Sequence, residues 1–246
     1  MGNVLVNDVY LYGIADALRE KHDTEKKYLP SEMEDAVRGI QSGSGVDLLE
    51  YSVYIMDSFS GMDFGSQTDI HIKLGTKVDA NYKTNSLRQA FANTKGVKNI
   101  KITTKESSVT VNLQNLFYNS ADLEVVDLTD FKLKASSITQ LFHSCRKLRE
   151  VKGVLDLTSN TSSSMPLYNC LALEDITIKE GTIHEGLNLM LSPLLNEKSR
   201  QSVIDGLADL TGGTSQNIIW HKTFDTVITD EQKAQITSKN WTMAFG

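Results

Sequence analysis

The sequence predicts an α/β fold in which short coils of chain stack side by side. Three observations lead to this prediction: an internal repeat of 25 to 26 residues, a short strand-like segment inside each repeat, and helix and strand signals on both sides of the repeats. The chain has 246 residues, of which 40% are hydrophobic, and this is enough to bury a substantial core. We therefore expect an ordered protein.

The repeat is clearest in LQNLFYNSADLEVVDL, residues 113–128, which has three relatives that begin at Leu87, Ile138 and Met165. Their aromatic residues are separated by 26, 25 and 26 residues and are Phe91, Phe117, Phe142 and Tyr168. Two later apolar positions follow in parallel: Val97, Leu123, Leu148 and Leu173, then Ile100, Val126, Val151 and Ile176. A fixed period in the twenties is typical of a leucine-rich-repeat solenoid, whose coils bury their apolar faces against one another. We predict about four coils, with a short parallel sheet, over residues 87–182.

Each coil is expected to contain one helical turn and one strand. In residues 113–128, Leu113, Leu116 and Phe117 have the spacing of a helix, and LEVVDL reads as a strand. With Tyr168 as its aromatic residue, the last coil is one residue short before its strand leucine. The segment KGVLDL after Val151 predicts an irregular strand.

Small side chains precede each strand leucine by three residues, at Thr94, Ser120, Cys145 and Cys170. Only small side chains fit where successive coils turn tightly, and free cysteine is often buried, so we interpret the cysteines as buried free thiols. The spacing leaves a disulfide between them open, although two cysteines without a secretion signal do not favour it. Neither cysteine lies in a CxxC or CxxH pair of the kind that binds zinc. No metal or cofactor is predicted.

The outward strand positions carry charges that alternate from coil to coil. One column contains Lys98, Glu124, Arg149 and Glu174, and another contains Lys101, Asp127, Lys152 and Thr177. Neighbouring strands lie about 4.8 Å apart, so opposite charges in a column attract each other. We interpret the columns first as residues that fix the strand register and second as ligand contacts. The candidate binding surface consists of Lys98, Lys101, Glu124, Asp127, Arg149, Glu174 and Thr177, and its balanced charge suits a neutral or mixed-charge partner.

Before the repeats, residues 1–41 predict a module of two amphipathic helices. The second helix begins with a capping box formed by Ser31 and Glu34. Residues 42–45 contain glycine and serine and predict a flexible linker. Whether the two helices pack on the repeats or bind a partner is left open.

Capping units are expected at both ends of the repeats, because the end of a solenoid exposes an apolar face. Residues 46–86 predict a β-rich cap with strands in YSVYIM and DIHIKLG. Residues 183–246 predict α/β capping units: a helix that ends at a glycine pair within DLTGGTS, a strand in QNIIWH, a helix with a capping box at Thr229 and Gln232, and a final strand. The two tryptophans, Trp220 and Trp241, are expected in the core or the cap.

Composition and motifs restrict the function. A net charge of −6 and a pI near 5.4 argue against binding of nucleic acid. The first residues do not resemble a signal peptide, and no apolar stretch is long enough to cross a bilayer, so we expect no membrane insertion. The motifs of zinc proteases, serine hydrolases and nucleotide-binding loops are missing, and we expect no enzyme. His143 is interpreted as a solvent-facing turn residue, at the position of Ala92, Tyr118 and Asn169 in the other coils.

The segments LFHSCRKLREV and LYNCLALEDI resemble the BspA-like leucine-rich repeats of bacterial surface proteins and of phage or prophage proteins. Residues 14–40 are similar to a segment found at the start of tail-associated, minor structural proteins of phages of Gram-positive bacteria. The C-terminal units are similar to the closing unit of such chains.

The resemblance implies a non-enzymatic structural protein of a phage tail or baseplate. It would be made in the bacterial cytoplasm without a signal peptide and reside in the virion. The N-terminal module would bind tail or baseplate proteins, and the repeats would contact a host-cell surface protein or glycan or serve assembly. The alternative is a bacterial cell-surface adhesin or a general protein-interaction module, and an adhesin would need an export signal and an anchor. A polysaccharide-binding accessory domain is a third reading, for which aromatic platforms would be expected.

Overall fold

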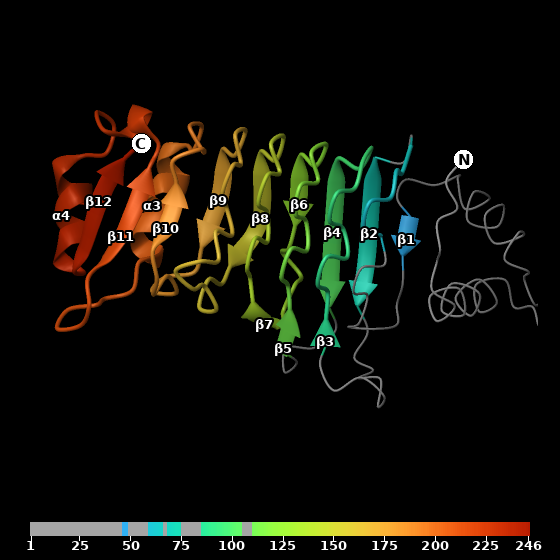
Figure 1. Ribbon diagram of the computed structural model, residues 1–246, viewed down its shortest axis with the longest axis horizontal. Coiled ribbons are helices and arrows are strands. Elements are labelled where there is room, and N and C mark those ends of the chain that lie inside the picture. The colour runs from blue at the N-terminus through green and yellow to red at the C-terminus, as the bar shows by residue number, and fades with distance from the viewer. Residues whose placement is uncertain (1–45, 49–58, 66–67, 75–84, 105–109) are drawn as a thin grey trace, which may run out of the picture.

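The computed structural model describes residues 46–48, 59–65, 68–74, 85–104 and 110–246. Within these ranges the chain has an α/β fold with parallel strands and few helices (Figure 1). The expected N-terminal helices, the linker at 42–45 and the expected strand YSVYIM lie outside the described residues.

The largest sheet has six parallel strands in the order β1-β2-β4-β6-β8-β9 (Figure 1). Its strands are β1 (Val46–Leu48), β2 (Asp69–Leu74), β4 (Asn99–Thr104), β6 (Val125–Asp127), β8 (Glu150–Leu155) and β9 (Asp175–Ile178). Strand β2 confirms the strand expected in DIHIKLG, and it pairs with β4 residue by residue. The parallel strand pairing therefore continues from the segment expected to form the N-terminal cap into the repeats.

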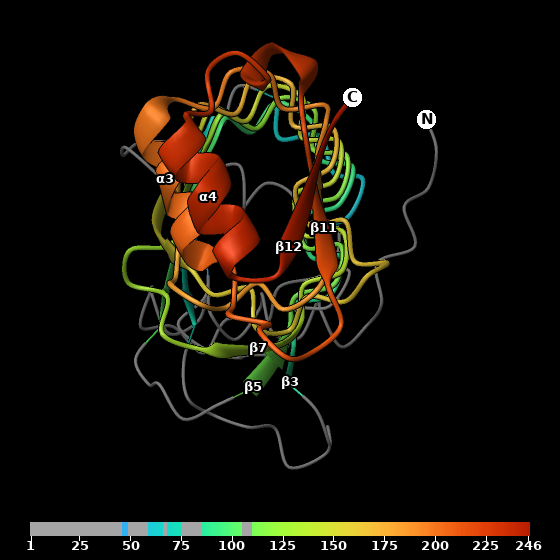
Figure 2. The ribbon, with the colours of Figure 1, turned by 90° about the vertical axis from the view of Figure 1, so that its left-hand side faces the viewer.

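Two smaller parallel sheets complete the fold. One contains β3 (Asn85–Ser86), β5 (Thr110–Asn112) and β7 (Lys134–Ser137), and the other contains β10 (Leu187–Leu189), β11 (Gln216–Trp220) and β12 (Trp241–Phe245). The helices are α3 (Glu197–Gly206), the short 3-10 helix η1 (Lys222–Phe224) and α4 (Asp230–Ser238). Figure 2, which looks along the row of strands, shows α3 and α4 across the section from β11 and β12.

The strands of the six-stranded sheet alternate between core and solvent. In β4, Ile100 and Ile102 are buried while Lys101 between them is half-buried, as the two-residue period of a strand requires. Ile100 is paired in register with Ile70 on one side and with Val126 on the other. The column predicted from the repeat is buried throughout and consists of Ile100, Val126, Val151 and Ile176.

The aromatic column is confirmed in its first three members and corrected in the fourth. Phe117 stacks between Phe91 and Phe142, with ring centroids 6.1 and 5.3 Å away. The N–H of Phe117 bonds the carbonyl of the residue before Phe142, and the N–H of Phe142 bonds the carbonyl of the residue before Leu167. The buried Leu167, and not Tyr168, therefore continues the column. The step becomes 25 residues, so the expectation of a shortened last coil is wrong.

The expected helical turn is replaced by two consecutive tight turns. The N–H of Leu116 bonds the carbonyl of Leu113, and the N–H of Ser120 bonds that of Phe117. Left-handed residues interrupt any helix in each coil, at Gln89, Asn115, Gln140 and Met165 and again at Asn93, Asn119, Ser144 and Asn169. A pair of turns buries Leu113, Leu116 and Phe117 on one side, and this imitates the spacing of a helix.

The column of small side chains is buried as expected and has a second role. The Cys145 thiol donates to the Phe117 carbonyl at 2.9 Å, and the Cys170 thiol donates to the Phe142 carbonyl at 3.2 Å. Ser120 makes the equivalent bond to the Phe91 carbonyl. Both thiols are free and buried, and burial raises the pKa of Cys145 to about 12 and that of Cys170 well above its ordinary range. Each position therefore needs a donor as well as a small volume.

The C-terminal units follow the prediction except at the end of α3. The N-cap of this helix is Asn196, whose side chain accepts from the Ser199 N–H, and the helix ends at Gly206 before the extended Leu207. The expectation that it reaches the glycines of DLTGGTS is wrong, and that segment is a loop rather than a helix C-cap. A Cβ at Gly206 would lie 2.6 Å from Ile178 Cγ2, so the close packing of α3 on β9 requires glycine there.

The later elements confirm their predictions. Helix α4 has the expected capping box between Thr229 and Gln232, and strands β11 and β12 lie where expected. Trp220 and Trp241 are buried, and the indole N–H of Trp241 donates to the Ala208 carbonyl at 2.9 Å. They belong to the core and not to an exposed platform.

Lys239, the C-cap residue of α4, binds the C-terminal end of α3 through its side chain, and removal of this ammonium group should lower the stability measurably. Its ammonium donates to the carbonyls of Ile204, Asp205 and Leu207 at 3.0, 3.1 and 2.9 Å. Lys239→Met leaves these carbonyls without their cation, and we expect the free energy of unfolding to fall by about 1–3 kcal/mol. Urea denaturation followed by circular dichroism measures the loss. Lys222→Met, at an exposed lysine, is the control and should change it by less than about 0.5 kcal/mol; equal losses would contradict the capping role.

Candidate functional site

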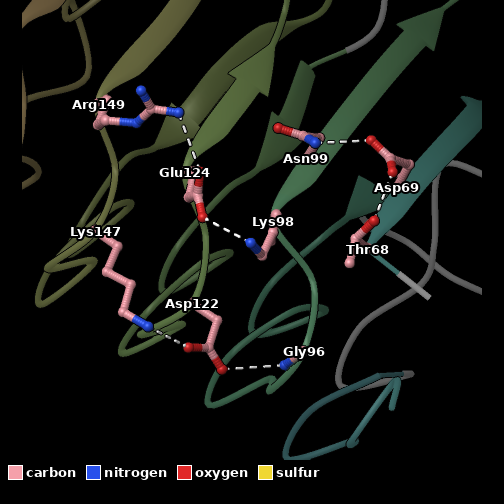
Figure 3. A network of polar contacts seen from close by, with 9 residues as sticks. All are labelled: Thr68, Asp69, Gly96, Lys98, Asn99, Asp122, Glu124, Lys147 and Arg149. Atoms are coloured by element: carbon pink, nitrogen blue, oxygen red, sulfur yellow. Dashed lines mark hydrogen bonds and ion pairs between the residues drawn. The ribbon is translucent and has the colours of Figure 1, made fainter. Parts of the chain in front are cut away.

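The first charge column forms a row of ion pairs across three coils (Figure 3). Glu124 accepts from Lys98 at 3.3 Å and from Arg149 at 3.0 Å. The hydrogen bond from Lys98, together with the charge of Arg149, holds the pKa of Glu124 below its ordinary value. The Arg149 guanidinium is paired with Glu124. Glu174, in the next coil, contacts this row through its backbone N–H, which donates to the Arg149 carbonyl at 2.9 Å.

The second column is confirmed at Lys101 and Asp127 and corrected at Thr177. The Lys101 ammonium lies 3.6 Å from Asp127 and 3.3 Å from Asp130. Burial raises the pKa of Asp127, but hydrogen bonds from Thr129 and the charge of Lys101 outweigh it and hold the pKa below its ordinary value. Thr177 does not follow in this column, because the register shifts and pairs it with Val154.

A third row was missed by the sequence reasoning. Asp122 accepts from Lys147 at 2.8 Å and from the Gly96 N–H at 3.1 Å (Figure 3). The hydrogen bond from Lys147, followed by that from Gly96, lowers the pKa of the Asp122 carboxyl. These residues are separated by 26 and 25 residues, so the repeat itself carried the signal.

Polar contacts between neighbouring strands continue from β4 to β2 through the side-chain amide of Asn99. Asn99 donates to Asp69 at 2.7 Å, and the Thr68 hydroxyl donates to the other oxygen of the same carboxylate at 2.7 Å (Figure 3). These two hydrogen bonds, that from Thr68 first, hold the pKa of Asp69 below its ordinary value. Exposed ion pairs contribute at most about 1 kcal/mol each, so the rows add little to the stability of the fold, and they present a surface of paired charges. That they fix the strand register stays a prediction.

A hollow of about 230 Å³ lies on the outer side of the sheet, where β8, β9 and the first turn of α3 meet. Its charged lining residues are Glu150, Lys152, Asp175 and Lys198, and Thr177 and Ser199 also line it. Of the residues selected from the sequence, only Thr177 belongs to it. Of the other six, five form the ion-paired rows beside it, and Glu174 joins them through its backbone N–H.

A half-buried column of rings lies outside the phenylalanine column. His143 is sandwiched between Tyr118 and Tyr168, with both ring centroids 5.2 Å away. The equivalent residue in the last coil is therefore Tyr168 and not Asn169. The expectation that His143 is a turn residue is confirmed by the bond from its N–H to the Gln140 carbonyl, but its ring is half-buried between two tyrosines rather than solvent-facing. The faces of these rings pack on one another, so they do not offer a flat platform to a sugar.

The half-buried position of His143 predicts a pH dependence of stability. Burial lowers the pKa of His143 below its ordinary value of 6.5, so the unfolded chain binds more protons than the folded chain in this range. We expect the free energy of unfolding to fall as the pH is lowered through 6.5 and to level off below the folded pKa. Urea midpoints between pH 5 and 8 measure this slope. His143→Tyr, which supplies the ring found in the neighbouring coils, should flatten it; an unchanged slope would contradict the assignment to His143.

The described residues offer neither a cluster of metal ligands nor a helix that could span a membrane. These residues do not gather three His, Cys, Asp or Glu side chains into a metal-binding group. The helices in the described ranges are too short or too polar to cross a membrane. No family model, curated protein or solved structure matches the chain.

Proposed function

We propose that the chain is a non-enzymatic structural protein of a phage or prophage tail or baseplate. In this proposal a BspA-like leucine-rich-repeat solenoid displays its strand face for host recognition or for assembly with other proteins. The observation that carries the display function is the row of Lys98, Glu124 and Arg149, whose charges are paired across coils into a continuous polar surface. The resemblance of residues 14–40 to tail-associated proteins supplies the phage context.

The solenoid, with about four coils over residues 87–182, is supported by the repetition of one set of contacts. Phe91, Phe117 and Phe142 stack in adjacent coils, and parallel strands follow each of them. The buried donors at Ser120, Cys145 and Cys170 repeat with the same period. Stacking of structurally equivalent units explains why each coil adds its buried side chains to one continuous core.

In the proposed virion protein, residues 1–41 bind tail or baseplate proteins and the strand face meets the host or another structural protein. A bacterial cell-surface adhesin or a general interaction module of the same repeat class is the alternative. Both functions use the same paired surface, and they differ in where the protein resides.

Proteomics of density-purified phage particles and of washed cells, both from an induced culture of the strain that encodes the chain, separates the two. Enrichment on particles, with immunogold label at the tail, is the expected result. Enrichment on washed cells with none on particles would overturn the phage proposal and favour the adhesin. A housekeeping cytoplasmic protein followed in parallel controls for carry-over from lysed cells.

A further inference from the structure

The two rows of ion pairs on the strands do not continue from β8 to β9, although Asp156 and Lys179, just beyond the ends of these strands, form an ion pair at 2.8 Å. Val151 pairs with Ile176, but the next paired residue of β8 is Val154, so Lys152 and Gly153 are extra residues relative to β9. Gly153 has a φ of +92° that permits this bulge, and Val154 is turned outward with 61% of its surface exposed. Bulges re-aim side chains and are frequent beside binding sites.

The sheet also ends at this place, because α3 takes the position of the next strand. The N–H of Ile176 donates to the Ser199 hydroxyl at 2.9 Å, and that of Ile178 donates to the Ser202 hydroxyl at 2.8 Å. The two serines thus replace the carbonyls of a neighbouring strand. This arrangement brings the exposed Lys198 from the first turn of α3 to the rim of the hollow.

The charges that line the hollow are less firmly paired than those of the rows. The Lys152 ammonium lies 3.8 Å from Glu150, beyond hydrogen-bond distance, whereas Lys147 lies 2.8 Å from its carboxylate. Glu150 and Asp175 are partners in register on neighbouring strands, an arrangement of like charges that costs stability. The hollow therefore brings together the carboxylate of Glu150 and the ammonium groups of Lys152 and Lys198. Beside them lies Asp175, whose Oδ1 already accepts a hydrogen bond from the Asn196 amide and whose Oδ2 remains to accept another.

We propose that this hollow binds one ring of a neutral saccharide. A sugar hydroxyl both donates and accepts, so it can bond the carboxylates of Glu150 and Asp175 and the ammonium groups of Lys152 and Lys198 together. A neutral ligand leaves the balance of two negative and two positive groups intact, whereas a polyanion or a basic side chain would oppose one pair. The hollow is smaller than the ~300–1,000 Å³ of sites for drug-sized ligands, which favours a single ring.

This inference rests on the proposed display function, since it gives the displayed face a ligand. It is tested by titrating the full chain with cellotetraose, maltotetraose and tetra-N-acetylchitotetraose, with tetragalacturonic acid as the anionic comparison. We expect calorimetric binding of at least one neutral oligosaccharide in preference to the anionic one. Glu150→Gln with Asp175→Asn should weaken it at least about tenfold, because two charge-assisted hydrogen bonds become neutral ones.

The matched control is Glu180→Gln with Asp225→Asn, which removes the same charge at exposed positions outside the hollow and should leave binding unchanged. Lys198→Gln, at an exposed position, should weaken binding about threefold and keeps the test decisive if the double variant does not fold. Lack of binding to every neutral oligosaccharide at millimolar concentration, or equal binding by the hollow variants and the control, would overturn the proposal. Loss of binding to washed host cells in the hollow variants without any saccharide binding would assign the hollow to a protein and also overturn it. Failure of the proposed function appears separately, as absence from phage particles.

Discussion

Phe117→Ala is expected to lower the free energy of unfolding by about 3–5 kcal/mol. The Phe117 ring has no solvent exposure and is covered on both faces, by Phe91 and by Phe142. Alanine leaves a cavity between two coils whose separation is fixed by the hydrogen bonds of their parallel strands. Because the strands hold the coils apart, the core cannot collapse into the space, and the loss should lie in the upper part of the range for phenylalanine.

Two control variants separate the ladder position from the general loss of an aromatic side chain. Phe117→Leu should cost less than half as much, because Leu167 occupies the equivalent position in the last described coil. Phe131→Ala removes a ring that is only partly buried against the core and should also cost less. Guanidinium denaturation followed by circular dichroism gives all three values. A loss for Phe117→Ala no greater than that for Phe131→Ala would show that the stacked column is not a main source of stability.

The buried columns could be predicted from the sequence because burial depends on side-chain type and spacing. Val126 and Ile100 recur at the period of the repeat, and the structure places them in register. The last member of the aromatic column could not be assigned from spacing, because Leu167 and Tyr168 are adjacent and both suit an apolar column. The left-handed backbone at Asn169 fixes the alignment, and a backbone angle is not visible in the spacing of side chains.

The ion-paired rows of the candidate surface could also be predicted from the type and spacing of side chains. The pairs of Lys98 with Glu124 and of Lys101 with Asp127 follow from alternating charge at a fixed period. The hollow could not be predicted from the repeat. It depends on a register shift and on a helix that takes the place of a strand, and each of these features occurs outside the repeating pattern. The irregular KGVLDL segment marked the place but gave no indication of the direction in which its side chains point.

Gly153→Ala is the second large effect, and we expect it to lower the free energy of unfolding by about 3 kcal/mol. A Cβ at this position would lie 2.8 Å from the backbone carbon and oxygen of Leu128 and 2.9 Å from the nitrogen of Thr129. These are main-chain atoms of the preceding coil, so they cannot move aside as the end of a flexible side chain could. The left-handed φ of +92° adds a conformational cost for any residue with a Cβ.

Gly181→Ala separates the two contributions, because Gly181 also has a left-handed φ, of +66°, but a Cβ there meets nothing within 4 Å. It should cost only about 1 kcal/mol, and the difference between the two variants in urea denaturation measures the contact with Leu128 and Thr129. Equal losses would mean that the bulge can shift away from the preceding coil. A pliable bulge would not hold Lys152 and Gly153 in fixed positions, so the same comparison also tests whether the lining of the hollow is rigid enough to select a ligand by shape.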